Sequence, residues 1–168
     1  MPSVRSVAFT GHRPESLPFG NDEDAPSCQA LKDKLYSAIV RIAELGPVIF
    51  YCGMAQGVDI ICGELVLAAE ERYPDISLCC VLPYRNHGQR WPAAWRNRHN
   101  ALLEAASWID CLSEVSHRDC YHRRNRYLIE NAETLIAVYD GRETGGTAYT
   151  VQYARKRNRH VIVIDPNQ

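Results

Sequence analysis

The sequence predicts an α/β fold in which helices cover both faces of one doubly wound, mostly parallel sheet. Three observations in the 168 residues lead to this expectation: short apolar runs alternate with segments of helical periodicity, glycine-bearing loops follow three of the runs, and no linker or repeat divides the chain. Strands joined by single helices form parallel sheets, because right-handed crossovers place the helices on the faces. We therefore expect one domain over residues 1–168, with strand order 3-2-1-4-5-6.

The elements follow from the runs in chain order. SVAFT ends at Gly11, and the next segment shows apolar residues at helical spacing until a Gly-Pro pair at residues 46–47 stops it. VIFYC leads into a helix that ends before Pro74, and ISLCCVL ends at Pro83. We expect strands over residues 6–10, 48–52, 76–82, 108–112, 134–139 and 161–164, and helices over residues 29–45, 57–72, 93–106, 121–132 and 147–157.

Composition narrows the class of protein. The formal net charge is −1, whereas a dedicated nucleic-acid binder is typically basic. No N-terminal segment resembles a signal peptide, and no apolar run approaches the ~18 to 20 residues that span a bilayer. We expect a soluble, cytoplasmic protein without a membrane partner, and the sequence leaves a homo-oligomer open.

The seven cysteines are interpreted as reduced thiols of the core. Several of them lie in apolar strand-like runs, such as Cys79 and Cys80 in SLCCVL. Cysteine and histidine, the usual zinc ligands, gather at one place in the sequence: Cys111, His117, Cys120 and His122. Their spacing matches no zinc pattern. No metal is expected.

Three glycine-bearing loops follow predicted strands: TGHRP at residues 10–14, CGMAQGVD at residues 52–59 and YDGRETGGT at residues 139–147. The carboxyl ends of parallel strands meet at one edge of a sheet, where ligands bind. Glycine lets backbone N–H groups approach a phosphate, and a following helix adds its positive end. The loops match neither a Walker motif nor a GxGxxG fingerprint. They predict a site for a phosphate-bearing nucleotide beside the first strand.

Each loop has its own expected role. Phosphate contacts are expected from the first and third loops, ribose contacts from the second, charge neutralisation from the YHRRNR run, and a base platform from the loop after the third strand. The predicted ligand-binding residues are Thr10, Gly11, His12, Arg13, Gly53, Met54, Ala55, Gly57, Asp59, Tyr84, Arg124, Asn125, Asp140, Gly145, Gly146 and Thr147. Trp91 is an alternative to Tyr84 as the platform. Two readings of Asp59 stay open: it stabilises the start of a helix, or it accepts a ribose hydroxyl.

These motifs together carry a family resemblance. CGMAQGVD, then LSE at residues 112–114, then HRRNRYLIENAETLIAVYDGRETGGTAYTVQYA resemble in order the Rossmann core of the DprA and Smf DNA-processing proteins, with its SGxAxGID, Ser-Glu, PxRNRxI and SGSLxTAxxA motifs. TGHRP and the small size resemble the YpsA-type branch of the same SLOG superfamily. The resemblance implies a Rossmann-like fold that binds nucleotides or related ligands at its glycine loops.

A more distant resemblance bears on catalysis. The LOG-type phosphoribohydrolases of the superfamily pair an arginine with the glutamate of PGGxGTxxE. Arg124 is similar to that arginine, but Tyr149 and Thr150 stand where the glutamate would fall. No catalytic residue is therefore assigned.

The leading expectation is non-catalytic binding or sensing of an ADP-ribose-like, NAD-derived or mononucleotide ligand, with no cofactor required. One alternative is DprA-like binding of single-stranded DNA by Arg13, Arg123, Arg124 and Arg126 with nearby aromatic residues Tyr84, Trp91 and Trp95. A second is LOG-type hydrolysis, with Asp59, Glu114 or Asp140 in place of the missing glutamate.

Overall fold

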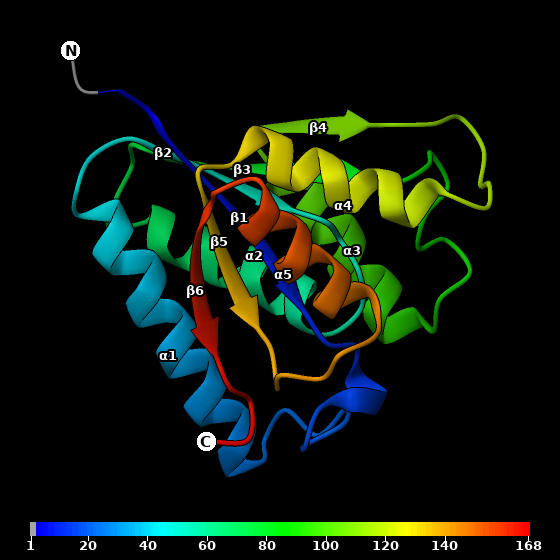
Figure 1. Ribbon diagram of the computed structural model, residues 1–168, viewed down its shortest axis with the longest axis horizontal. Coiled ribbons are helices and arrows are strands. Elements are labelled where there is room, and N and C mark those ends of the chain that lie inside the picture. The colour runs from blue at the N-terminus through cyan, green and yellow to red at the C-terminus, as the bar shows by residue number, and fades with distance from the viewer. Residues whose placement is uncertain (1–2) are drawn as a thin grey trace.

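Six parallel strands form one sheet in the computed structural model, which describes residues 3–168 (Figure 1). The strands are β1 (Arg5–Gly11), β2 (Val48–Cys52), β3 (Ile76–Leu82), β4 (Trp108–Cys111), β5 (Thr134–Val138) and β6 (His160–Ile164). The helices are η1 (Pro14–Ser16, a 3-10 turn), α1 (Pro26–Ala43), α2 (Val58–Glu70), α3 (Ala93–Ala105), α4 (Cys120–Asn131) and α5 (Gly146–Lys156). The α/β class and the parallel sheet are confirmed.

The expected strand order is wrong in one respect. The observed order is β4-β3-β2-β1-β5-β6, so β5 and not β4 lies beside β1. The strand next to β1 has a helix layer on each face and must be apolar over most of its length, as TLIAV in β5 is after Thr134. WIDC in β4 leaves Trp108 and Ile109 largely exposed, which suits the edge of the sheet beyond β3. The direction in which successive strands are added therefore still reverses beside β1, and the crevice lies between β1 and β5.

Two helix layers cover the sheet. α1, α2 and α3 pack on one face, where Phe9 of β1 and Phe50 of β2 stack with ring centroids 5.7 Å apart. α4 and α5 pack on the other face, through Leu128 and Val151. In Figure 1, α4 and α5 lie in front of the strands. The crevice is thus bordered by α2 from one layer and by α4 and α5 from the other.

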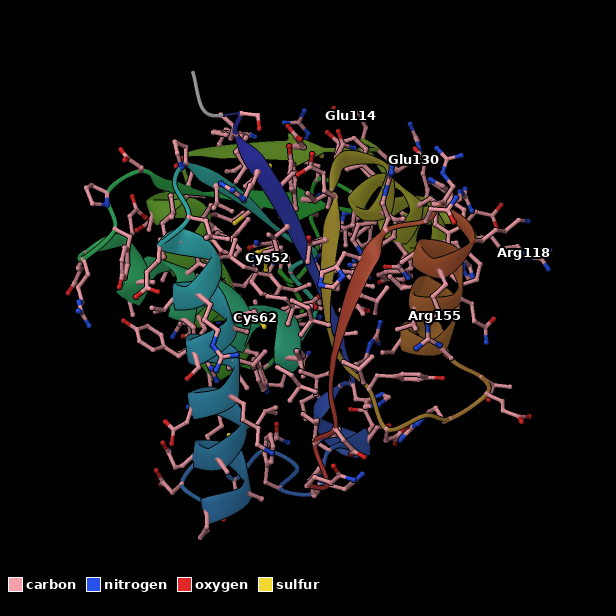
Figure 2. The ribbon with its side chains drawn as sticks, turned by 60° about the vertical axis from the view of Figure 1, so that its left-hand side comes forward. Cys52, Cys62, Glu114, Arg118, Glu130 and Arg155 are labelled. Carbon is pink, nitrogen blue, oxygen red and sulfur yellow. The ribbon has the colours of Figure 1, made fainter. Side chains whose placement is uncertain are left out.

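The expectation of core thiols is confirmed for all cysteines except Cys111, which is exposed. Figure 2 shows Cys52 and Cys62 in the interior of the molecule, while Arg118 and Arg155 lie at its outside. Burial raises the pKa of the Cys52 and Cys62 thiols, so both stay protonated. Within residues 3–168, no helix combines the length and apolarity needed to cross a bilayer.

Gly11 allows the end of β1 to touch the start of α2. A Cβ atom at this position would lie 2.5 Å from the Cβ of Val58, the first residue of α2. This close approach brings the loop after β1 against the loop after β2.

We predict that Gly11→Ala lowers the free energy of unfolding by about 1–3 kcal/mol, because the added methyl group overpacks this contact. Gly146→Ala is the matched control, since a Cβ there meets only Asn125 Nδ2, at 4.0 Å. Urea denaturation measures both variants. Equal urea denaturation midpoints for the two variants would show that the β1–α2 contact accommodates the added methyl group without loss of stability.

Candidate functional site

A cavity of about 230 Å³ opens at the carboxyl ends of β1 and β5, where the strand order reverses. Its wall comes from the β1–η1 loop, the loop before α2, the first turns of α4 and the loop before α5. The predicted site residues that line it are Thr10, Gly11, His12, Arg13, Ala55, Asp59, Arg124, Asn125, Gly145, Gly146 and Thr147. The structure thus brings the three glycine loops to one place.

Arg124 is the most buried cation of this wall, with 5% of its surface exposed. Its Nη1 donates a hydrogen bond to the carbonyl of Gly53 at 2.7 Å, and its Nε donates to Asn125 Oδ1 at 3.1 Å. A Cβ at Gly53 would come within 3.0 Å of Arg124 Cδ and of Asp59 Oδ2, so glycine leaves room for the guanidinium. Burial lowers the pKa of Arg124, partly offset by the charge of Asp59.

Asp59 lies in the first turn of α2 and is 6% exposed. Its Oδ2 accepts a hydrogen bond from the Ala55 N–H at 3.2 Å. Burial raises the pKa of this carboxyl, against the opposing effects of Arg124, the Ala55 N–H and Arg13. The side chain therefore fixes the loop before α2 and also lines the cavity, so both readings of Asp59 stay compatible with its position.

His12 connects the first and third glycine loops. It is buried, its Nε2 accepts the Asp140 N–H at 3.3 Å, and burial lowers its pKa. Arg142 Nη2 contacts Asp140 Oδ2 at 2.5 Å and holds the pKa of that carboxyl well below its usual range. Asp140 thus lies behind the cavity, while Arg142 lines it.

The N-terminus of α5 supplies backbone donors. Gly145 has a φ of +106°, a conformation that favours glycine, and its carbonyl accepts the N–H of Tyr149. The amides of Gly146, Thr147 and Ala148 precede this first helical hydrogen bond. Amides in this position, at the positive end of a helix, form an anion-binding nest.

Five predicted residues do not line the cavity. One of them is Asp140, described above. The residues Gly53, Met54 and Gly57 lie behind those that line the cavity: Met54 is fully buried, and a Cβ at Gly57 would lie 2.8 Å from the His12 carbonyl oxygen. Tyr84 lies farther out, with its ring centroid 6.4 Å from that of Tyr121.

Sequence reasoning missed several lining residues. These are Phe9, Glu15, Ser16, Tyr121, Leu128, Arg142 and Thr144. Arg142 and Thr144 lie within YDGRETGGT, where only the paired glycines, Asp140 and Thr147 were expected to bind, and Glu15 lies one residue beyond TGHRP. The Tyr121 ring lies 5.7 Å from the guanidinium carbons of both Arg13 and Arg124. The tyrosine at the start of YHRRNR was a signal for an aromatic wall.

Comparison with known proteins identifies the family of this chain. A profile of the YspA SLOG family matches residues 7–166. The chain belongs to this family. UPF0398 proteins of Bacillus cereus and of Bacillus thuringiensis are each 26% identical to it over 157 residues, which cover 92% of this chain and 84% of the relative. The YpsA-type resemblance is confirmed, and these names state neither a ligand nor a reaction.

A buried histidine pair adjoins the cavity. His87 Nδ1 lies 3.3 Å from His99 Nε2, and the two side chains are 2% and 0% exposed. Burial lowers the pKa of His99, and burial together with the charge of Arg124 lowers the pKa of His87 to about 3. Both rings are therefore neutral at physiological pH.

We predict that the free energy of unfolding falls as the pH drops from 6.5 to 5. His12, His87 and His99 have lowered pKa values in the folded chain, so the unfolded chain binds protons first and acid favours unfolding. Each such histidine adds a slope of up to about 1.4 kcal/mol per pH unit.

Urea denaturation across this pH range tests the prediction. His87→Gln should lose about one histidine's share of the slope, whatever its stability at pH 7. His160→Gln, at an exposed position of β6, should keep the parental slope. Parallel slopes for all three proteins would contradict a neutral, buried His87.

Proposed function

We propose that this protein binds a nucleotide by its phosphate group and does not transform it. The observation that carries the proposal is the convergence of two kinds of anion-binding group on one cavity. The N-terminal amides of α5 and the guanidinium groups of Arg13 and Arg124 border the same space at the reversal of the sheet. Charge-assisted donors and a helix N-terminus both favour phosphate.

The balance of charge around the cavity supports an anionic ligand. Arg142 is neutralised by Asp140, and Arg124 faces the partly compensating charge of Asp59. Arg13 forms no ion pair with any residue of the described range, 3–168, and lines the cavity. A phosphate would supply the missing partner to Arg13.

The size and lining of the cavity support a ribose phosphate. At about 230 Å³ the cavity is smaller than the ~300–1,000 Å³ typical of small-molecule sites, so it suits one portion of a larger ligand. The Asp59 carboxylate lines the wall opposite α5 and can accept hydrogen bonds from ribose hydroxyl groups. We infer the ligand to be a mononucleotide, or the ribose phosphate part of an ADP-ribose-like or NAD-derived molecule, with no cofactor involved.

The carboxylates around the site support binding over hydrolysis. Thr150, which falls near the position of the LOG-type glutamate, is buried and donates its hydroxyl to the Gly146 carbonyl at 2.9 Å. Glu114 pairs with Arg85 at the surface and does not line the cavity. Asp59 and Glu15 also line the cavity, but neither comes from α5, where the LOG-type glutamate would follow the glycine loop.

The placement of the arginines and tryptophans supports a small ligand over single-stranded DNA. Of the YHRRNR run, Arg124 turns into the protein while Arg123 faces solvent, so the run does not form one basic groove. The Arg98 guanidinium lies over the Trp95 ring, with its Cζ atom 4.5 Å from the ring centroid. The Trp95 indole N–H donates a hydrogen bond to Asn21 Oδ1. This ring is therefore occupied by contacts within the protein.

We predict that Gly146→Asp weakens the binding of AMP about 100-fold. Like charges ~5 Å apart repel by about 3 kcal/mol at an effective dielectric constant near 20. Isothermal titration calorimetry measures the affinity, with circular dichroism as a check on folding. Gly146→Ala is the neutral control and should bind AMP nearly as the parent does, because the added methyl group would come no closer than 4.0 Å to Asn125 Nδ2.

Three outcomes would contradict the proposal. Unchanged affinity in a folded Gly146→Asp variant would exclude the α5 nest from the site. Protein-dependent release of adenine from AMP, followed by chromatography, would favour the hydrolase. Tight binding of oligonucleotides that collapses with added salt would favour the DNA-binding alternative.

A further inference from the structure

A second hollow of about 140 Å³ adjoins the central cavity. The two share Arg13, Glu15, Ala55 and Tyr121 as lining residues, so they lie side by side. A ligand whose phosphate and ribose fill the central cavity would reach this hollow past the side chains of Arg13 and Tyr121. The inference that follows rests on the proposed function.

Aromatic side chains form the walls of this second hollow. Trp91 and His87 meet edge to face, with ring centroids 4.9 Å apart, and Tyr121 lies 6.2 Å from His87. His99 fixes the group from behind, 3.3 Å from His87 and with its ring centroid 5.1 Å from that of Trp91. These rings are held in place by the protein, which lowers the entropic cost of stacking a flat ligand on them.

Two polar side chains, Gln56 and Glu15, complete the lining of the hollow. An amide both donates and accepts hydrogen bonds, whereas a carboxylate only accepts. A flat ligand at this place is therefore matched when its edge carries a donor for Glu15. Among nucleobases, an exocyclic amino group or a ring N–H provides that donor.

A competing hollow also shares lining residues with the central cavity, among them Tyr121, Gly145 and Gly146. It is wider, about 490 Å³, and is also bordered by His122 and Tyr149. The His122 and Tyr149 rings stack edge to face at 4.7 Å, and the Tyr149 hydroxyl accepts a hydrogen bond from Arg126 Nη1 at 3.5 Å. The hollow beside Trp91, by contrast, has the buried His87–His99 pair behind its rings.

We propose that Trp91, Tyr121 and His87 form the base subsite of the nucleotide, and that Glu15 accepts a hydrogen bond from an N–H group of the base.

The test compares AMP, purine riboside 5′-monophosphate and ribose 5-phosphate by isothermal titration calorimetry. The parent should bind AMP about tenfold or more tighter than ribose 5-phosphate, the gain typical of stacking a base on an aromatic side chain. In Trp91→Ala this preference should fall to within about twofold, and in Trp91→Phe it should persist, which separates lost stacking from lost folding. Tyr149→Ala, in the competing hollow, and Trp108→Ala, at the exposed sheet edge, should keep the full preference.

The choice between bases is measured in the same way. AMP should bind tighter than purine riboside 5′-monophosphate, whose base carries no N–H donor, and Glu15→Gln should narrow this ratio. A preference for AMP over ribose 5-phosphate that survives in folded Trp91→Ala, or that is lost in Tyr149→Ala, would overturn the subsite while leaving the phosphate site standing. If ribose 5-phosphate itself does not bind the parent protein, the proposed function fails and the subsite fails with it.

Discussion

The buried guanidinium of Arg124 is the contact on which the rest of the site depends. It reaches from α4, on one face of the sheet, to the Gly53 carbonyl after β2, and so joins the two halves of the chain across the crevice. Removing a cation from water is costly unless hydrogen bonds and an opposite charge replace the solvent. Gly53, Asn125 and Asp59 provide these partners, and the lowered pKa of Arg124 together with the raised pKa of Asp59 shows that the compensation is incomplete.

This incomplete compensation gives the site its chemical character. An anion in the cavity would stabilise Arg124 further and would satisfy the amides at the start of α5 at the same time. The surrounding contacts prepare the cavity for that event: Gly11 lets β1 meet α2, and His12 connects the loops after β1 and β5. The loops are therefore positioned by buried contacts of the scaffold before any ligand arrives.

Much of the fold follows from local patterns in the sequence, and the departures have physical reasons. Apolar runs and glycine stops located every strand and α-helix to within a few residues, because periodicity reflects burial directly, whereas the short η1 turn was expected to be loop. The position of β4 did not follow, since strand order depends on which strand must be buried on both faces. The contrast between TLIAV and WIDC carried that information. The burial of Arg124 also follows from the sequence, because Arg124 lies at helical spacing between the buried residues Cys120 and Leu128. The lining by Glu15 depends on the turn after TGHRP, whose geometry the short motif does not specify.

The central claim is that the amides at the start of α5, together with Arg124, receive a phosphate. Two-dimensional ¹H–¹⁵N NMR during titration with ribose 5-phosphate tests it most directly, because the amide signals report the contacts themselves. The account predicts saturable downfield shifts of the Gly146, Thr147 and Ala148 amides and a shift of the Arg124 Nε–H signal, with little change in α1. Shifts confined to other surfaces, or none at millimolar ligand, would contradict it.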